Sequence, residues 1–100
     1  MSYEAFMETV VTEDEPNPGL SEILKALWWC AKGDWDAAHN IVQDIDDADG
    51  SWVHAHLHRV EGDLGNAGYW YNRANQPMCR DSLEAERAAL ISHFLERMSD

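Results

Sequence analysis

The sequence contains few basic residues. Its 100 residues include 7 lysines and arginines against 19 aspartates and glutamates, which gives a formal net charge of −12. Nucleic acids and anionic membrane surfaces are bound through clusters of positive charge, so this composition argues against both as partners. An acidic surface suits either a saline habitat or a basic partner.

Cysteines and long apolar runs are also scarce. Cys30 and Cys79 are the only cysteines and neither belongs to a CxxC pair, which argues against a disulfide framework. No apolar run approaches the roughly 18 residues of a membrane span. The first 15 residues contain five acids and no base, the opposite of a signal peptide. We therefore expect a cytoplasmic protein that does not bind membranes.

The sequence lacks the common enzyme motifs as well. It has no GxSxG nucleophile motif, no phosphate-binding P-loop and no glycine-rich dinucleotide fingerprint. These absences indicate no cofactor and favour a non-enzymatic role, although they leave room for an enzyme of an unusual kind.

The sequence does contain an internal repeat. Residues 31–38 (AKGDWDAA) recur 29 positions later as residues 60–67 (VEGDLGNA), and both copies share the pattern Gly-Asp-x-x-x-Ala. In each copy a glycine that can end one helix stands directly before an aspartate that can cap the next. Each copy therefore predicts two helices joined by a very short turn, and the chain as a whole predicts an all-α fold.

Apolar periodicity places five main helices in one domain, residues 20–100. They are expected from Ser21 as N-cap to Lys32, from Trp35 to Ile45, from Ser51 as N-cap to about Glu61, from Asp63 as N-cap to a point before Pro77, and after Asp81 or Ser82 as N-cap. In the third, Val53, Leu57 and Val60 should point inward. Gly65 and Gly68 are costly within the fourth unless another backbone approaches closely.

Residues 1–19 form an acidic N-terminal arm that Pro16 to Gly19 separates from the domain. Within the arm, residues 3–11 can form a short helix with Phe6, Met7 and Val10 on one side. We expect the arm to be partly mobile or docked on the domain.

The repeat resembles that of helical-hairpin proteins of the tetratricopeptide and Sel1-like kinds. The residues that carry the resemblance are Gly33, Asp34, Ala38, Gly62, Asp63, Ala67, Tyr71 and Ala74. It implies two stacked helical hairpins plus a C-terminal capping helix, in a tetratricopeptide-like right-handed solenoid. Residues 52–63 and 66–71 also look like those of a group of uncharacterised bacterial proteins, a likeness that implies no activity.

One flank of the third predicted helix carries His54, His58 and Glu61, because residues three and four apart share a helix face. This spacing suits a metal site or an acid–base pair, for which His39 is the natural further ligand. The histidines can instead form half-buried hydrogen bonds across the hairpin, with Asp36, Asn66 or Tyr69 as partners. A partner-binding surface is the third interpretation.

An offset of 29 maps the flank of the third helix onto Lys25, Trp29 and Lys32 of the first. The first helices of successive hairpins line the concave face of a solenoid, so we expect one groove between them. Trp29 would be its apolar anchor unless the N-terminal arm covers it. The expected binding residues are Lys25, Trp29, Lys32, His54, His58, Glu61 and the more exposed Tyr69.

The function predicted from the sequence is therefore that of an interaction or scaffold module. It would bind a protein, a peptide or a small ligand in the groove, and it would form a homodimer if its terminal faces need cover. The alternative is a small metal-dependent or histidine-based enzyme centred on His39, His54, His58 and Glu61.

Overall fold

The computed structural model describes residues 1–98, so the last two residues of the expected domain lie outside it. The described residues form six α-helices and no strand, which confirms the predicted all-α class. The helices are α1 (Tyr3–Thr12), α2 (Glu22–Lys32), α3 (Trp35–Val42), α4 (Ala48–Val60), α5 (Leu64–Ala74) and α6 (Leu83–Met98). None of them combines the length and apolar character needed to cross a bilayer.

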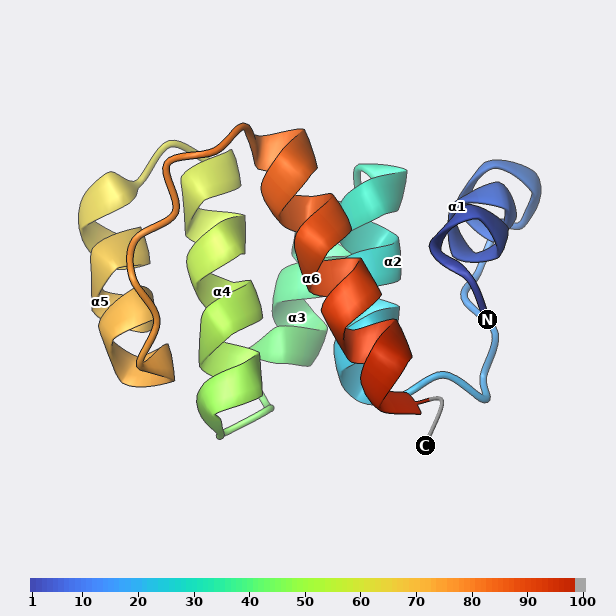
Figure 1. Cartoon of the computed structure of the whole chain (residues 1–100), viewed down its shortest axis with the longest axis horizontal. Coiled ribbons are helices and arrows are strands. Elements are labelled where there is room, and N and C mark those ends of the chain that lie inside the picture. Colours follow the sequence, from blue (N-terminus) through green and yellow to red (C-terminus); the bar gives the residue numbers. More distant parts are fainter. Residues whose placement is uncertain (99–100) are drawn as a thin grey trace.

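Helices α2 to α5 form two hairpins, and the junctions within them have the predicted chemistry (Figure 1). Gly33 and Gly62 adopt left-handed backbone conformations, with φ of +91° and +85°. The following residues, Asp34 and Asp63, cap α3 and α5 by accepting a backbone N–H at 3.0 and 3.1 Å. The internal repeat therefore encodes two equivalent helix–turn–helix junctions.

The boundaries between the hairpins differ from the prediction. Helix α3 ends at Val42 rather than Ile45, although Ile45 still packs against the core from the turn that follows. Helix α4 begins at Ala48, and its N-cap is Asp47 rather than Ser51. The Asp47 carboxylate accepts the backbone N–H of residue 50 at 2.8 Å, which starts the helix one turn early.

Three glycines show where a missing side chain matters. A Cβ atom on Gly50 would lie 2.1 Å from the carbonyl oxygen of Ile45, so this position requires glycine for a close backbone approach. By contrast, a Cβ on Gly68 would meet nothing within 4 Å, and one on Gly65 would only touch the Asp63 side chain at 4.0 Å. The close approach considered for α5 is therefore absent, and it occurs at the start of α4 instead.

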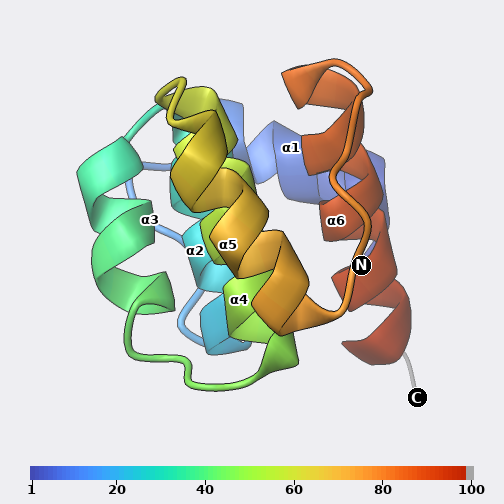
Figure 2. The same cartoon turned by 90° about the vertical axis from the view of Figure 1, so that its left-hand side faces the viewer.

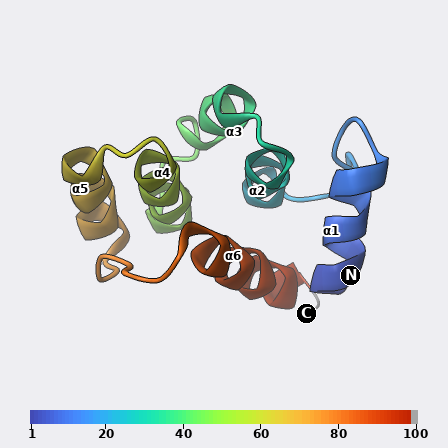
Figure 3. The same ribbon diagram turned by 90° about the horizontal axis from the view of Figure 1, so that it is seen from above.

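Helix α6 covers one side of the two hairpins. Viewed from above, α2 and α4 lie between α3 on one side and α6 on the other, and α6 packs against α1, α2 and α4 (Figure 3). The Ser82 hydroxyl caps α6 by accepting the N–H of Ala85 at 3.0 Å, as predicted. Helix α5 has no other helix on its outer side among the described residues (Figure 2).

The N-terminal arm is docked. Phe6 is fully buried in the core, Val10 is almost so, and the Trp28 indole N–H donates to the Thr9 hydroxyl at 3.0 Å. Of the inward residues predicted for α4, Val53 and Leu57 are fully buried, whereas Val60 is 41 % exposed. The prediction for Val60 was wrong because the junction at residue 62 ends the helix at the molecular surface.

Candidate metal centre

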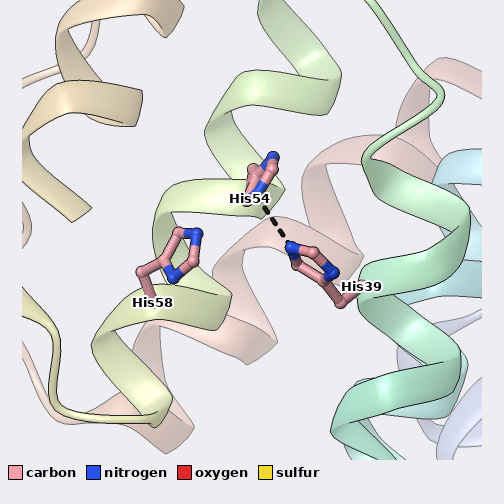
Figure 4. A group of neighbouring side chains, drawn as sticks. All are labelled: His39, His54 and His58. Carbon is pink, nitrogen blue, oxygen red and sulfur yellow. Dashed lines mark hydrogen bonds between the residues drawn. The ribbon is translucent and has the colours of Figure 1, made fainter. Parts of the chain in front are cut away.

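Three histidines converge between α3 and α4 (Figure 4). His39 projects from α3, and His54 and His58 project from successive turns of α4. The Nε2 atoms of His39 and His54 are 3.1 Å apart, and one ligand nitrogen from each ring lies within 4.8 Å of the others. His54 and His58 are buried, whereas His39 is half-buried.

The spacing of the rings suits one metal ion. With Zn–N bonds of 2.0–2.1 Å, a tetrahedral ion would hold its imidazole nitrogens about 3.3 Å apart and the ring centroids about 5 Å apart. The centroid of His54 lies 4.8 Å from those of both His39 and His58, and the remaining pair is 5.8 Å apart. Small ring movements would therefore bring the three nitrogens onto one ion.

Glu61 supports the cluster from outside. It is the C-cap of α4, one turn after His58, and its carboxylate accepts the His58 Nδ1–H at 2.5 Å. This hydrogen bond places the proton on Nδ1 and leaves the Nε2 lone pair of His58 for a metal. Zinc-binding histidines commonly make such a contact with a carboxylate, which fixes the tautomer and the ring orientation.

The electrostatics of the cluster keep His54 uncharged. Burial lowers the pKa of His54 to about 4, and the neighbouring His58, His39 and Arg73 act in the same direction. Because a metal ion binds the neutral imidazole, this ring needs to lose no proton at neutral pH to become a ligand.

Two tryptophans flank the histidines. The Trp35 ring stacks on His39, with 4.7 Å between centroids and 9° between planes. The Trp70 ring stacks on His54 at 3.9 Å and 13°. Each of these two imidazoles thus has one face covered by an indole.

The hydrogen bonds of the cluster differ from those considered in the sequence. The partner of His54 is His39, and that of His58 is Glu61, rather than Asp36, Asn66 or Tyr69. Tyr69 is 50 % exposed, as predicted, and stacks on Trp70 at 5.1 Å.

The three expected binding residues of α2 contact residues other than His54, His58 and Glu61. Lys25 pairs with Glu22 at 3.1 Å. The Lys32 ammonium donates to the carbonyl oxygens of Val10 and Glu13, at 2.7 and 2.8 Å, at the end of α1. Since His54 and His58 contact α3 and α5 instead, the structure does not bring the two sets of residues together.

Trp29 lies beside the arm but is not fully buried. It packs edge-on against Trp28, with the centroids 5.1 Å apart, and lines an open cleft of about 780 Å³. The other side of the cleft is formed by Thr9 of α1 and by residues 13–18, in the connection from α1 to α2. The arm therefore borders Trp29 instead of covering it.

A second buried polar cluster, around Glu86 of α6, was not predicted from the sequence. This carboxylate is 5 % exposed and accepts hydrogen bonds from His56 at 2.6 Å, from Arg59 at 2.7 Å and from the Tyr71 hydroxyl. Burial alone would raise the pKa of Glu86, but the three donors outweigh it and hold the pKa at about 2. One signal in the sequence could have predicted its burial, because Glu86 lies on the same face of the helix as Leu83 and Leu90.

No family model, curated protein or solved structure matches this chain.

Proposed function

We propose that the protein binds a transition-metal ion, with Zn²⁺ as the best fit, through His39, His54 and His58. The observation that carries the proposal is the convergence of three ring nitrogens within 4.8 Å. The Glu61 contact to His58 and the neutral state of His54 support it. Imidazole nitrogen suits Zn²⁺ better than the hard ions Mg²⁺ and Ca²⁺, which prefer oxygen ligands.

A centre of three histidines leaves one position of a tetrahedral ion for water. Catalytic zinc sites have three protein ligands and an open position, whereas structural sites are closed by four. A zinc-bound water can serve as a nucleophile near neutral pH. The ligand set therefore supports the metal-dependent enzyme, of a hydrolytic or hydrating kind, over a purely structural ion. The framework of this centre, in our proposal, is the tetratricopeptide-like solenoid implied by the repeat.

Metal titration of the full chain tests the proposal. Wild-type protein should bind one Zn²⁺ in competition with a chromophoric chelator, and Zn²⁺ at a hundredfold excess over its dissociation constant should stabilise the fold by about 2.7 kcal/mol. The His39→Gln and His54→Gln variants should each lose at least about tenfold in affinity, since each removes one of three ligands.

His93→Gln is the matched control, because His93 is exposed on α6 and contacts Trp52 and Phe94 instead of the cluster. It should bind Zn²⁺ like the wild type. Absence of binding by the wild-type protein, or an equal loss in His93→Gln, would contradict the proposal.

A second candidate function is the interaction module, now centred on the Trp29 cleft. The observation that favours it is the position of Trp29 in an open cleft whose rim carries Glu13, Asp14 and Glu15. An indole next to carboxylates suits the arginine or lysine side chain of a partner peptide. An arginine-containing peptide should bind in a calorimetric titration, and Trp29→Ala should abolish this binding while Trp52→Ala does not. Unchanged binding by Trp29→Ala would exclude this cleft.

A further inference from the structure

We propose that the metal centre acts on a substrate with an anionic oxygen group, a carboxylate or a phosphoryl group, and that Arg73 of α5 binds this group. This inference rests on the proposed function and adds to it the class of substrate. Three features of Arg73 lead to it: its position, its weak ion pair and the negative charge of its surroundings.

Arg73 lies beside the histidine cluster. Its guanidinium carbon is 5.1 Å from the centroid of the Trp70 ring, and that ring stacks on His54 at 3.9 Å. The guanidinium is therefore within about 10 Å of the His54 ring, one Debye length at moderate salt. Its charge is one of those that lower the pKa of His54. A positive charge that disfavours a protonated histidine attracts an anion to the same place.

The aromatic side chains of α5 hold the guanidinium and leave most of its donors available. Arg73 donates one hydrogen bond to the Tyr69 hydroxyl, at 3.4 Å, and its guanidinium carbon lies 5.9 Å from the Tyr69 centroid. Because a guanidinium carries five N–H groups, the others can form the paired hydrogen bonds that carboxylates and phosphoryl groups accept.

The ion pair of Arg73 is weak enough for a substrate to replace it. Its Nη2 atom is 3.6 Å from an Asp46 carboxylate oxygen, and the two side chains are 45 % and 93 % exposed. Exposed pairs of this kind contribute little to stability. Among the described helices, α3 and α5 both pack against α4 and not against each other. The pair thus links α5 to the connection that follows α3, next to the elements that carry the histidines (Figure 4).

The rest of the surface repels anions. Acidic residues outnumber lysines and arginines by 19 to 7, and Asp46, Glu61 and Asp63 lie near the cluster itself. An anion therefore gains most where the metal ion and Arg73 supply positive charge together.

Two kinds of hydroxamate probe test the proposal on the zinc-loaded full chain. The monohydroxamates of succinic, glutaric and adipic acids carry a metal-binding group and a distal carboxylate, whereas alkyl hydroxamates of equal length lack the carboxylate. At least one carboxylate probe should bind about tenfold more tightly than its neutral counterpart in calorimetry, the size of one charge-assisted hydrogen bond. Probes with a distal phosphonate distinguish a phosphoryl group from a carboxylate.

Three variants assign this gain to Arg73. Arg73→Gln should lose the gain, bind the neutral probes like the wild type and bind Zn²⁺ at least as tightly, because it removes a positive charge near the ligands. Arg80→Gln removes the same charge from the connection between α5 and α6, beside Trp52, and should keep the gain. Asp46→Asn frees Arg73 from its ion pair and should increase the gain.

The outcomes distinguish the two proposals. If the wild-type protein does not bind Zn²⁺, the proposed function fails, and the inference fails with it. If it binds Zn²⁺ but no carboxylate or phosphonate probe binds more tightly than its neutral counterpart, the inference alone is overturned. A gain that persists in Arg73→Gln, or that Arg80→Gln loses equally, would also overturn it.

Discussion

Glu86 shows how one carboxylate can join three helices. It belongs to α6, His56 and Arg59 come from α4, and Tyr71 comes from α5. Arg59 also donates to the carbonyl oxygen of Asp81 at 2.6 Å, which attaches the segment before α6. Because burial without partners is costly for each of these groups, the cluster stabilises the fold only while it is complete.

Replacing Glu86 should therefore destabilise the protein strongly. A pKa lowered from its ordinary value to about 2 corresponds to about 3 kcal/mol of stability, and Glu86→Gln should lose about that amount in urea unfolding at pH 7. Glu84→Gln, at an exposed position of the same helix, should change stability by less than about 0.5 kcal/mol. Equal effects of the two changes would contradict a stabilising role for the cluster.

The Glu86 carboxylate also predicts that the fold loses stability in acid. Its pKa is lower in the folded than in the unfolded chain, so its contribution is complete above about pH 5 and is lost as the pH falls toward 2. Unfolding free energies measured between pH 6 and 2 should decline in the wild type. Glu86→Gln should show a shallower decline, and identical slopes would show that other acids cause the loss.

At the scale of helices, the chain uses glycine in two opposite ways. Gly33 ends α2 in a left-handed conformation that other residues adopt with strain, whereas Gly68 lies inside α5 with open space around its missing side chain. The same substitution should therefore have opposite effects at the two positions.

Gly33→Ala should destabilise the protein by about 1 kcal/mol, because alanine must adopt a positive φ. Gly68→Ala should stabilise it by up to about 1 kcal/mol, because alanine favours the helix interior and meets no neighbour. Thermal unfolding of both variants provides the measurement. A destabilised Gly68→Ala would mean that this face of α5 is covered in solution.

The helix boundaries also show what a sequence can predict. The two Gly-Asp junctions were predictable because their signals are local. The start of α4 was not, because residues 44–49 contain four aspartates that can each act as a cap. Asp47 is used where the backbone of Gly50 packs against Ile45, a contact that the sequence pattern does not reveal.

The candidate site was also predictable only in part. The sequence predicted that His54, His58 and Glu61 share one flank, since this follows from helix periodicity, and it named His39 as the further ligand. The indole contacts of Trp35 and Trp70 depend on how α3 and α5 pack against α4, so periodicity within one helix could not predict them. For the same reason, the separation of Trp29 from the histidines became visible only in the folded chain.

At the scale of the whole molecule, α1 completes the core that α2 and α6 begin. Phe6 has no exposed surface, and it packs in the same cluster as Leu24, Trp28 and Ile91. The N-terminal arm thus contributes to the core of the domain, even though a proline-rich segment separates it in sequence.

Phe6→Ala should therefore destabilise the protein by about 3–5 kcal/mol, the usual effect of emptying a buried aromatic position. Val11→Ala, at the neighbouring position that is 81 % exposed, should have an effect within about 0.5 kcal/mol. Urea unfolding followed by tryptophan fluorescence measures both. A small effect of Phe6→Ala would show that α1 is detached in solution.

The position of α6 affects how cooperatively the protein unfolds. In a linear repeat array each unit touches only its neighbours, so the ends can open while the middle stays folded. Here α6 lies along the two hairpins and packs against α1, α2 and α4 at once, while its Glu86 also holds α5. Opening either end of the molecule therefore exposes part of α6, which also supports the other end. Amide protons throughout the helices should then exchange with solvent through a single global unfolding event.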